Sequence, residues 1–157
     1  MKFFNIYTLI ALFCSLSAST ALAVDTCGSF TIKDNPFPCC THTDKSKGNC
    51  TWWAWKKAMD QWKIAPVSKG NAGTWATNKS SKFSVSDKPR KDSIVEFSGH
   101  VAWVTSVYDK CIKTDKKGKC TATQQRIKGT EMNCPDQYQA YGAFDYPAAS
   151  KKYIYKK

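Results

Sequence analysis

Residues 48–55 read Gly-Asn-Cys-Thr-Trp-Trp-Ala-Trp, where a polar loop changes into an aromatic-rich segment. Apolar side chains then recur every three or four residues, while charged side chains occupy the opposite face. Pro66 ends the pattern. We therefore predict an amphipathic helix from Cys50 to Lys63. Its buried face consists of Trp52, Trp55, Ala58, Met59 and Trp62.

Cys50 is a candidate nucleophile because it lies in the first turn of this helix. The thiolate is the reactive form of cysteine, and the free N–H groups and partial positive charge of a helix N-terminus stabilise that anion. Thiol catalysis also requires a base, which has to come from another part of the chain.

Strand patterns occupy the second half of the chain. Short runs rich in β-branched and aromatic residues alternate with turn signals such as Ser98-Gly99. One early helix followed by a mainly antiparallel sheet predicts the α+β class, with the tryptophan face of the helix packed on the sheet. This packing brings Cys50 close to the sheet. The predicted strands are 93–97, 101–108, 127–133 and 153–155.

His100 is the better candidate base of the two histidines, because His42 lies in a cysteine-rich N-terminal region. His100 opens a strand directly after a glycine, where its ring can extend beyond the sheet. Alternation places His100 and Ala102 on one face of the strand, and Val101 and Trp103 on the other. The alternative is a purely structural histidine.

A third polar group follows in the segment 129–133. Alternation places Glu131 and Asn133 on one face of their strand and Met132 on the other. A carboxylate or amide beside His100 would accept a hydrogen bond from one ring nitrogen and leave the other to take the thiol proton. The alternative is a solvent-facing polar pair at a strand end.

The eight cysteines divide unevenly. Cys14 lies in an N-terminal leader, and the seven others form an odd set, which leaves at least one thiol free or paired between molecules. Cys111 and Cys120 flank a lysine-rich turn and are expected to staple a hairpin. Two further bridges, of undetermined pairing, are expected among Cys27, Cys39, Cys40 and Cys134, with the adjacent Cys39 and Cys40 poorly placed to pair with each other. Cys50 then stays free.

A metal site is not expected. The run Cys39-Cys40-Thr41-His42 with Cys50 lacks the usual ligand spacing for zinc, and an oxidising compartment favours disulfides. Residues 44–49 contain one carboxylate and two lysines, a poor set for calcium. No cofactor is predicted.

Residues 1–23 have the features of a cleaved signal peptide, with an apolar run and small residues before position 24. The apolar run is interrupted and shorter than the roughly 20 residues of a spanning helix, so no membrane anchor is expected. The predicted mature protein, residues 24–157, is one secreted or periplasmic domain and a monomer. We expect a disulfide-tethered arm at 24–47 and a core at 48–155.

Charge indicates the class of partner. The whole chain carries a formal net charge of +12. The lysines are scattered and form no nucleic-acid motif, so we expect an anionic envelope polymer, such as a cell wall or an acidic glycan, rather than nucleic acid. The alternative is a lysine-rich surface that only provides solubility.

Five segments resemble, in order, the blocks of the cysteine, histidine-dependent amidohydrolase/peptidase (CHAP) domain. This resemblance implies a papain-like fold and hydrolysis of peptidoglycan, by an N-acetylmuramoyl-L-alanine amidase or by a stem-peptide or cross-bridge endopeptidase. The segments are Gly48–Trp52, Gly70–Trp75, Gly99–Val104, Glu131–Asn133 and Tyr153–Tyr155.

The resemblance also implies roles for individual residues. Cys50 would be the nucleophile, His100 the base, and Glu131 the group that orients His100, with Asn133 as an alternative or additional orienting group. The main-chain N–H of Cys50 and the side chain of Asn49 would form an oxyanion hole. Three further residues would either shape the substrate groove or belong to the core, namely Asn71, Trp75 and Trp103.

The sequence departs from this family at the turn before residue 93. Pro89-Arg90-Lys91 is followed by Asp92 where a glycine is common, and aspartate tolerates the left-handed backbone that such a turn needs. The six paired cysteines and the hairpin insertion at 111–120 are also unusual. Two other functions stay open: a cationic envelope-binding protein without turnover, and an antibacterial toxin with the same Cys-His chemistry.

Overall fold

The computed structural model describes residues 24–39, 49–133 and 141–157. The described part is an α+β structure with a mainly antiparallel sheet, as predicted. Its helical elements are α1 (Asn49–Trp62), the 3₁₀ turn η1 (Ala72–Thr74) and α2 (Trp75–Asn78). A small hairpin contains β1 (Val24–Cys27) and β2 (Phe30–Lys33). The large sheet consists of β3 (Phe83–Ser86), β4 (Ser93–Phe97), β5 (His100–Thr114), β6 (Cys120–Glu131), β7 (Gly142–Pro147) and β8 (Lys152–Lys156).

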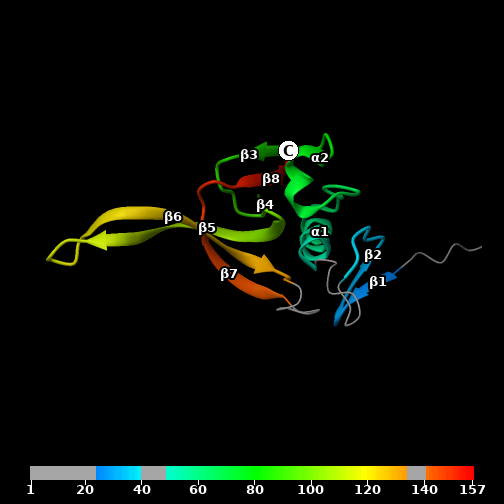
Figure 1. The fold of residues 1–157 in the computed structure, drawn as a ribbon, viewed down its shortest axis with the longest axis horizontal. Coiled ribbons are helices and arrows are strands. Elements are labelled where there is room, and N and C mark those ends of the chain that lie inside the picture. Colours follow the sequence, from blue (N-terminus) through cyan, green and yellow to red (C-terminus); the bar gives the residue numbers. More distant parts are fainter. Residues whose placement is uncertain (1–23, 40–48, 134–140) are drawn as a thin grey trace, which may run out of the picture.

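Antiparallel pairing connects the large sheet in the order β3-β8-β4-β5-β6-β7. Helix α1 lies against this sheet, and the β1–β2 hairpin lies on the other side of α1 (Figure 1). Phe30 of β2 contacts Trp53 of α1 edge to face, with ring centroids 5.2 Å apart. The N-terminal segment predicted as an irregular arm therefore contains a strand pair that covers the helix.

Helix α1 agrees with its predicted bounds to within one residue at each end. Lys63 follows the helix in the left-handed conformation (φ 58°) and donates its N–H to the carbonyl of Met59, which completes the last turn. Trp52, Trp55 and Trp62 are buried, as the periodicity predicted. The indole of Trp62 contacts that of Trp103 on β5, with centroids 4.9 Å apart.

The two faces of β5 enter different parts of the core. Val101 and Trp103 pack with α1, whereas Ala102 and Val104 pack with a second apolar cluster that includes Phe144. The predicted alternation is therefore confirmed. His100, at the start of β5, lies near the N-terminal end of α1, where Cys50 is close enough to affect its pKa.

The turn before β4 uses Asp92 in the left-handed conformation, with φ 55°. Its N–H donates to the carbonyl of Val104 on β5 over 3.0 Å. A short polar residue can adopt this conformation at modest cost. The turn therefore survives without the glycine, as expected from the sequence.

Two disulfides are present among the described residues, Cys27–Cys39 and Cys111–Cys120. The second is the hairpin pair expected from the sequence. Cys40 and Cys134 lie outside the described residues. Cys50 is the free cysteine of the described part of the chain. Within the same ranges, the structure contains no helix of the length and apolar character needed to cross a membrane.

The sheet differs from the prediction in extent. Strand β5 continues six residues past the predicted end at 108, and β6 starts at Cys120 instead of 127. The sequence signal was weak there because residues 109–114 are exposed on both faces and residues 120–126 are mostly polar and contain no buried residue, so both segments lack apolar alternation. Strand β6 ends at Glu131, which leaves Asn133 outside the ladder.

Candidate active site

Cys50 lies in the first turn of α1 with 8 % of its surface exposed. Three tryptophans in this half of the helix, Trp52, Trp53 and Trp55, are buried in the core. Indole Nε1 of Trp53 donates to Oγ1 of Thr130 on β6 over 3.1 Å. This contact fixes the first turn of the helix beside the strand that carries Glu131.

His100 and Glu131 come together through the pairing of β5 with β6. Nε2 of His100 lies 2.8 Å from Oε2 of Glu131, and both side chains are largely buried. The thiol of Cys50 lies close enough to His100 to help raise the pKa of the imidazole. With Nε2 engaged by the carboxylate, Nδ1 is the ring nitrogen left for the sulfur. The structure therefore brings together a thiol, an imidazole and a carboxylate.

The protonation of His100 follows from these contacts. Burial by itself lowers its pKa, but hydrogen bonds to Cys50 and Glu131, together with attraction to both, outweigh burial and raise the pKa from 6.5 to about 9. The imidazole therefore carries a positive charge at neutral pH. The aromatic ring of Phe97 lies 5.0 Å from that of His100, centroid to centroid, and adds a favourable surface for this cation.

Glu131 has a second partner that the sequence did not suggest. The hydroxyl of Tyr146 on β7 donates to Oε1 of Glu131 over 2.9 Å. Burial opposes ionisation of Glu131, but hydrogen bonds from His100 and Tyr146 and attraction to the imidazolium hold the pKa of this carboxyl below its usual value. Burial and the hydrogen bond to Glu131 raise the pKa of Tyr146 to about 12, so its hydroxyl stays a donor.

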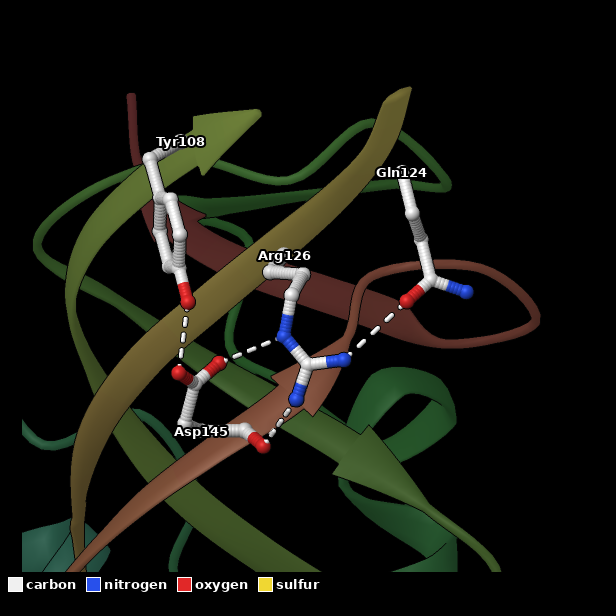
Figure 2. Close-up of polar contacts among 4 residues, drawn as sticks. All are labelled: Tyr108, Gln124, Arg126 and Asp145. Carbon is white, nitrogen blue, oxygen red and sulfur yellow. Dashed lines mark hydrogen bonds and ion pairs between the residues drawn. The ribbon is translucent and has the colours of Figure 1, made fainter. Parts of the chain in front are cut away.

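Strand β7 is held in place by a polar cluster on β5, β6 and β7 (Figure 2). Nε of Arg126 lies 2.7 Å from Oδ1 of Asp145, and the hydroxyl of Tyr108 donates to the other oxygen of the same carboxylate. Nη1 of Arg126 also donates to Gln124 over 3.0 Å. Asp145 directly precedes Tyr146 on β7. By fixing Asp145, this exposed cluster also fixes the position of Tyr146, which contacts Glu131.

Gly129 allows β6 to pass close to its neighbours two residues before Glu131. A Cβ atom at this position would lie 1.9 Å from the carbonyl oxygen of Trp103 and 2.6 Å from the ring of Phe144. Any side chain would force β5 and β7 away from β6. The absence of a side chain here keeps His100, Glu131 and Tyr146 within hydrogen-bonding distance.

The remaining candidates take different positions. Asn133 is exposed beyond the end of β6 and forms no side-chain hydrogen bond in the described structure, so the contact with His100 belongs to Glu131. Trp75 and Trp103 lie in the core, with 0 % and 2 % of their surfaces exposed, and therefore support the fold instead of lining a groove. Asn71 is exposed before η1. For Asn49, the structure describes the backbone, at the start of α1, but not the side chain.

A cavity of about 370 Å³ adjoins the site across the ring of Phe97. Its wall carries both acidic and basic groups, which suits a ligand with both amines and carboxylates. It is lined by Gly73, Asp87, Glu96, Phe97, Ser98, Ser150, Lys151 and Lys152.

Among the described residues, His, Cys, Asp and Glu side chains form no group of three or more that could hold a metal ion. Cys39, a member of the zinc set considered from the sequence, is bound to Cys27 in a disulfide and is unavailable as a thiolate ligand. Cys40 and His42 lie outside the described residues.

Comparison with known families identifies a match. The family model described as the CHAP domain matches residues 41–133, more than half of the chain. The matched segment contains Cys50, His100 and Glu131, and it ends before β7 and Tyr146. Searches of curated proteins and of solved structures gave no match.

Proposed function

Since the chain belongs to the CHAP domain family of cysteine- and histidine-dependent amidohydrolases and peptidases, we propose that it is an exported hydrolase of peptidoglycan amide bonds. The observation that carries this proposal is the contact of His100 with both Cys50 and Glu131. The bond cut is either the N-acetylmuramoyl-L-alanine amide or a peptide bond of the stem or cross-bridge.

The first half of the reaction forms a thioester. The thiol proton of Cys50 passes to His100, the sulfur attacks the carbonyl carbon of the substrate, and the electron pair of the C=O bond moves to oxygen. When the tetrahedral intermediate collapses, the C–N bond breaks and His100 gives its proton to the leaving amine. An imidazole with a pKa of about 9 is protonated at neutral pH and can supply that proton.

The second half of the reaction regenerates the enzyme. His100, now neutral, takes a proton from water, and the resulting hydroxide adds to the thioester carbonyl. The C–S bond then breaks, which releases the carboxylic acid product and returns the sulfur to its starting state. Glu131 keeps the imidazole oriented through both steps, because it accepts from Nε2 and leaves Nδ1 facing the reacting atoms.

The oxyanion requires donors near the sulfur. The main-chain N–H of Cys50 has no partner within α1, because it belongs to the first turn of the helix. We assign it to the oxyanion hole, with the Asn49 side chain as a second donor. One such donor stabilises the transition state by about 2.7–4 kcal/mol.

Export is supported by the cysteine chemistry. The two disulfides among the described residues of this small chain fit an oxidising compartment, either the periplasm or the medium. The predicted signal peptide at 1–23 belongs to the same proposal. A protein that only binds the envelope would not need a buried thiol held by an imidazole and a carboxylate, so the site favours turnover over binding alone.

The test is digestion of purified peptidoglycan by the protein and by Cys50→Ala and His100→Ala variants. We expect soluble fragments from the wild-type protein and none from either variant, with circular dichroism showing that all three are folded. Mass spectrometry of the fragments identifies the new termini and hence the bond. Undiminished release by either folded variant would overturn the proposal.

A further inference from the structure

The hairpin formed by β5 and β6 projects well beyond the rest of the molecule (Figure 1). Strand β7 pairs with β6 only from Arg126 onward, so residues 120–124 pair with β5 alone. Residues 109–120, here termed the lysine finger, are all exposed. The lysine finger contributes nothing to the core, and its function has to lie at its surface.

The lysine finger is strongly basic. It contains five lysines and two aspartates within twelve residues, a net charge of +3. Oδ1 of Asp115 accepts hydrogen bonds from the main-chain N–H groups of Lys117 and Lys119, so this carboxylate is committed to the turn. The lysines are Lys110, Lys113, Lys116, Lys117 and Lys119, and no lysine ammonium among them has an ion-pair partner in the described structure.

The finger is also built to keep its shape. An isolated two-stranded hairpin is marginally stable in water. Here the Cys111–Cys120 disulfide joins the two strands. The N–H of Gly118 donates to the carbonyl of Asp115, and Gly118 takes the left-handed conformation (φ 79°) that closes such a turn. The lysines are therefore held on a defined scaffold.

Distance determines what kind of partner fits. His100 begins β5 and the finger starts at residue 109 of this 15-residue strand, so at the usual rise per residue the finger lies about 30–45 Å from His100. A small molecule cannot reach both. A polymer that passes the active site and the finger can, and binding at the finger would raise the local concentration of cleavable bonds.

We propose that the lysine finger binds a phosphodiester polymer attached to the cell wall and so retains the enzyme on its substrate. The proposal rests on the peptidoglycan hydrolase function proposed above. Phosphodiesters carry one permanent negative charge per repeat, which complements the lysines, whereas peptidoglycan stem peptides carry amines as well as carboxylates. Lysine binds phosphate as a compact point charge.

An anionic lipid surface fits the finger less well. Interfacial membrane binding requires an apolar face rich in residues such as Trp, Phe and Leu. In the finger, Ile112 is the large apolar side chain that is exposed, at 57 %. One such side chain among five lysines favours a hydrated polyanion.

The test measures binding separately from hydrolysis by using the Cys50→Ala protein as background. The finger variant replaces Lys113, Lys116 and Lys117 by Gln. A matched control variant replaces three exposed lysines of the main body by Gln and removes the same total charge. The control positions are Lys69, Lys82 and Lys88. The probes are wall sacculi that retain their phosphodiester polymer, the same sacculi after its chemical removal, and vesicles of anionic phospholipid.

We expect the finger variant to bind intact sacculi at least about tenfold more weakly than the control variant at about 0.1 M salt, because each lysine near an anionic surface contributes separately. Removal of the polymer should abolish the difference between the two. Equal binding of the two variants to intact sacculi would overturn the proposal. So would control-variant binding that is as strong to stripped sacculi as to intact sacculi, or that is stronger to vesicles than to intact sacculi. With Cys50 restored, the finger variant should still hydrolyse soluble muropeptides, so failure of the hydrolase proposal would appear separately.

Discussion

The substitution Glu131→Gln tests how the site sets the charge of His100. A rise of the His100 pKa from 6.5 to about 9 corresponds to about 3 kcal/mol of preference for the protonated ring. Cys50 and Glu131 share this effect, with Cys50 first. Removing the Glu131 charge should therefore reduce the preference for the protonated His100 ring by about 1 kcal/mol, which lowers the pKa of His100 by somewhat less than one pH unit.

The activity of this variant should fall as well. Glutamine keeps an oxygen that can accept from Nε2, but it loses a charge-assisted hydrogen bond of about 1.5–3 kcal/mol, so kcat/KM should fall by about 10- to 150-fold. The alkaline limit of the pH profile should move to lower pH, because His100 must be protonated to release the amine.

The assay is hydrolysis of a soluble muropeptide across pH, with a nuclear magnetic resonance titration of His100 alongside. Asp60→Asn is the matched control, since it removes an exposed carboxylate that pairs with Lys56 on α1. An alkaline limit that stays unchanged in Glu131→Gln while activity falls would refute the electrostatic role. An alkaline limit that moves by the same amount in Asp60→Asn as in Glu131→Gln would also refute the electrostatic role of Glu131.

Three further predictions follow from the same geometry. Tyr146→Phe should lower kcat/KM by about tenfold and move the acid limit of the pH profile to higher pH, because the hydroxyl holds the pKa of Glu131 down; an unmoved acid limit would leave Tyr146 only a structural role. Gly129→Ala should destabilise the fold by about 3 kcal/mol through overpacking, and a midpoint of thermal unfolding within about 2 °C of wild type would contradict this. The positive charge of His100 should stabilise the fold fully below pH 6.5 and lose this effect as pH rises to about 9. At pH 6, urea should therefore unfold Glu131→Gln more easily than the wild type, and equal stability of the two proteins would argue against the His100–Glu131 ion pair.

Local patterns were enough to predict α1 and the His100 strand. The tryptophan periodicity defined the helix, and strand alternation separated Val101 and Trp103 from Ala102 and Val104. These features depend on neighbours in sequence, and the packing follows from burying one face.

Long-range pairing was not predictable in the same way. Tyr146 contacts Glu131 because β7 pairs with β6, and the sequence gives no local sign of that partner. The same limit explains Trp75 and Trp103, whose aromatic character suits a groove or a core equally until the neighbouring elements are placed. Asn133 lost its predicted alternation with Glu131 because the strand ends first.

The proposed catalysis depends most directly on the thiol of Cys50. The decisive measurement is alkylation of the native oxidised protein with iodoacetamide, in which peptide mapping and residual hydrolysis of peptidoglycan are followed in the same samples. We predict that label on Cys50 and loss of activity rise together in a one-to-one relation. Full hydrolysis by protein whose Cys50 is completely alkylated would contradict the account.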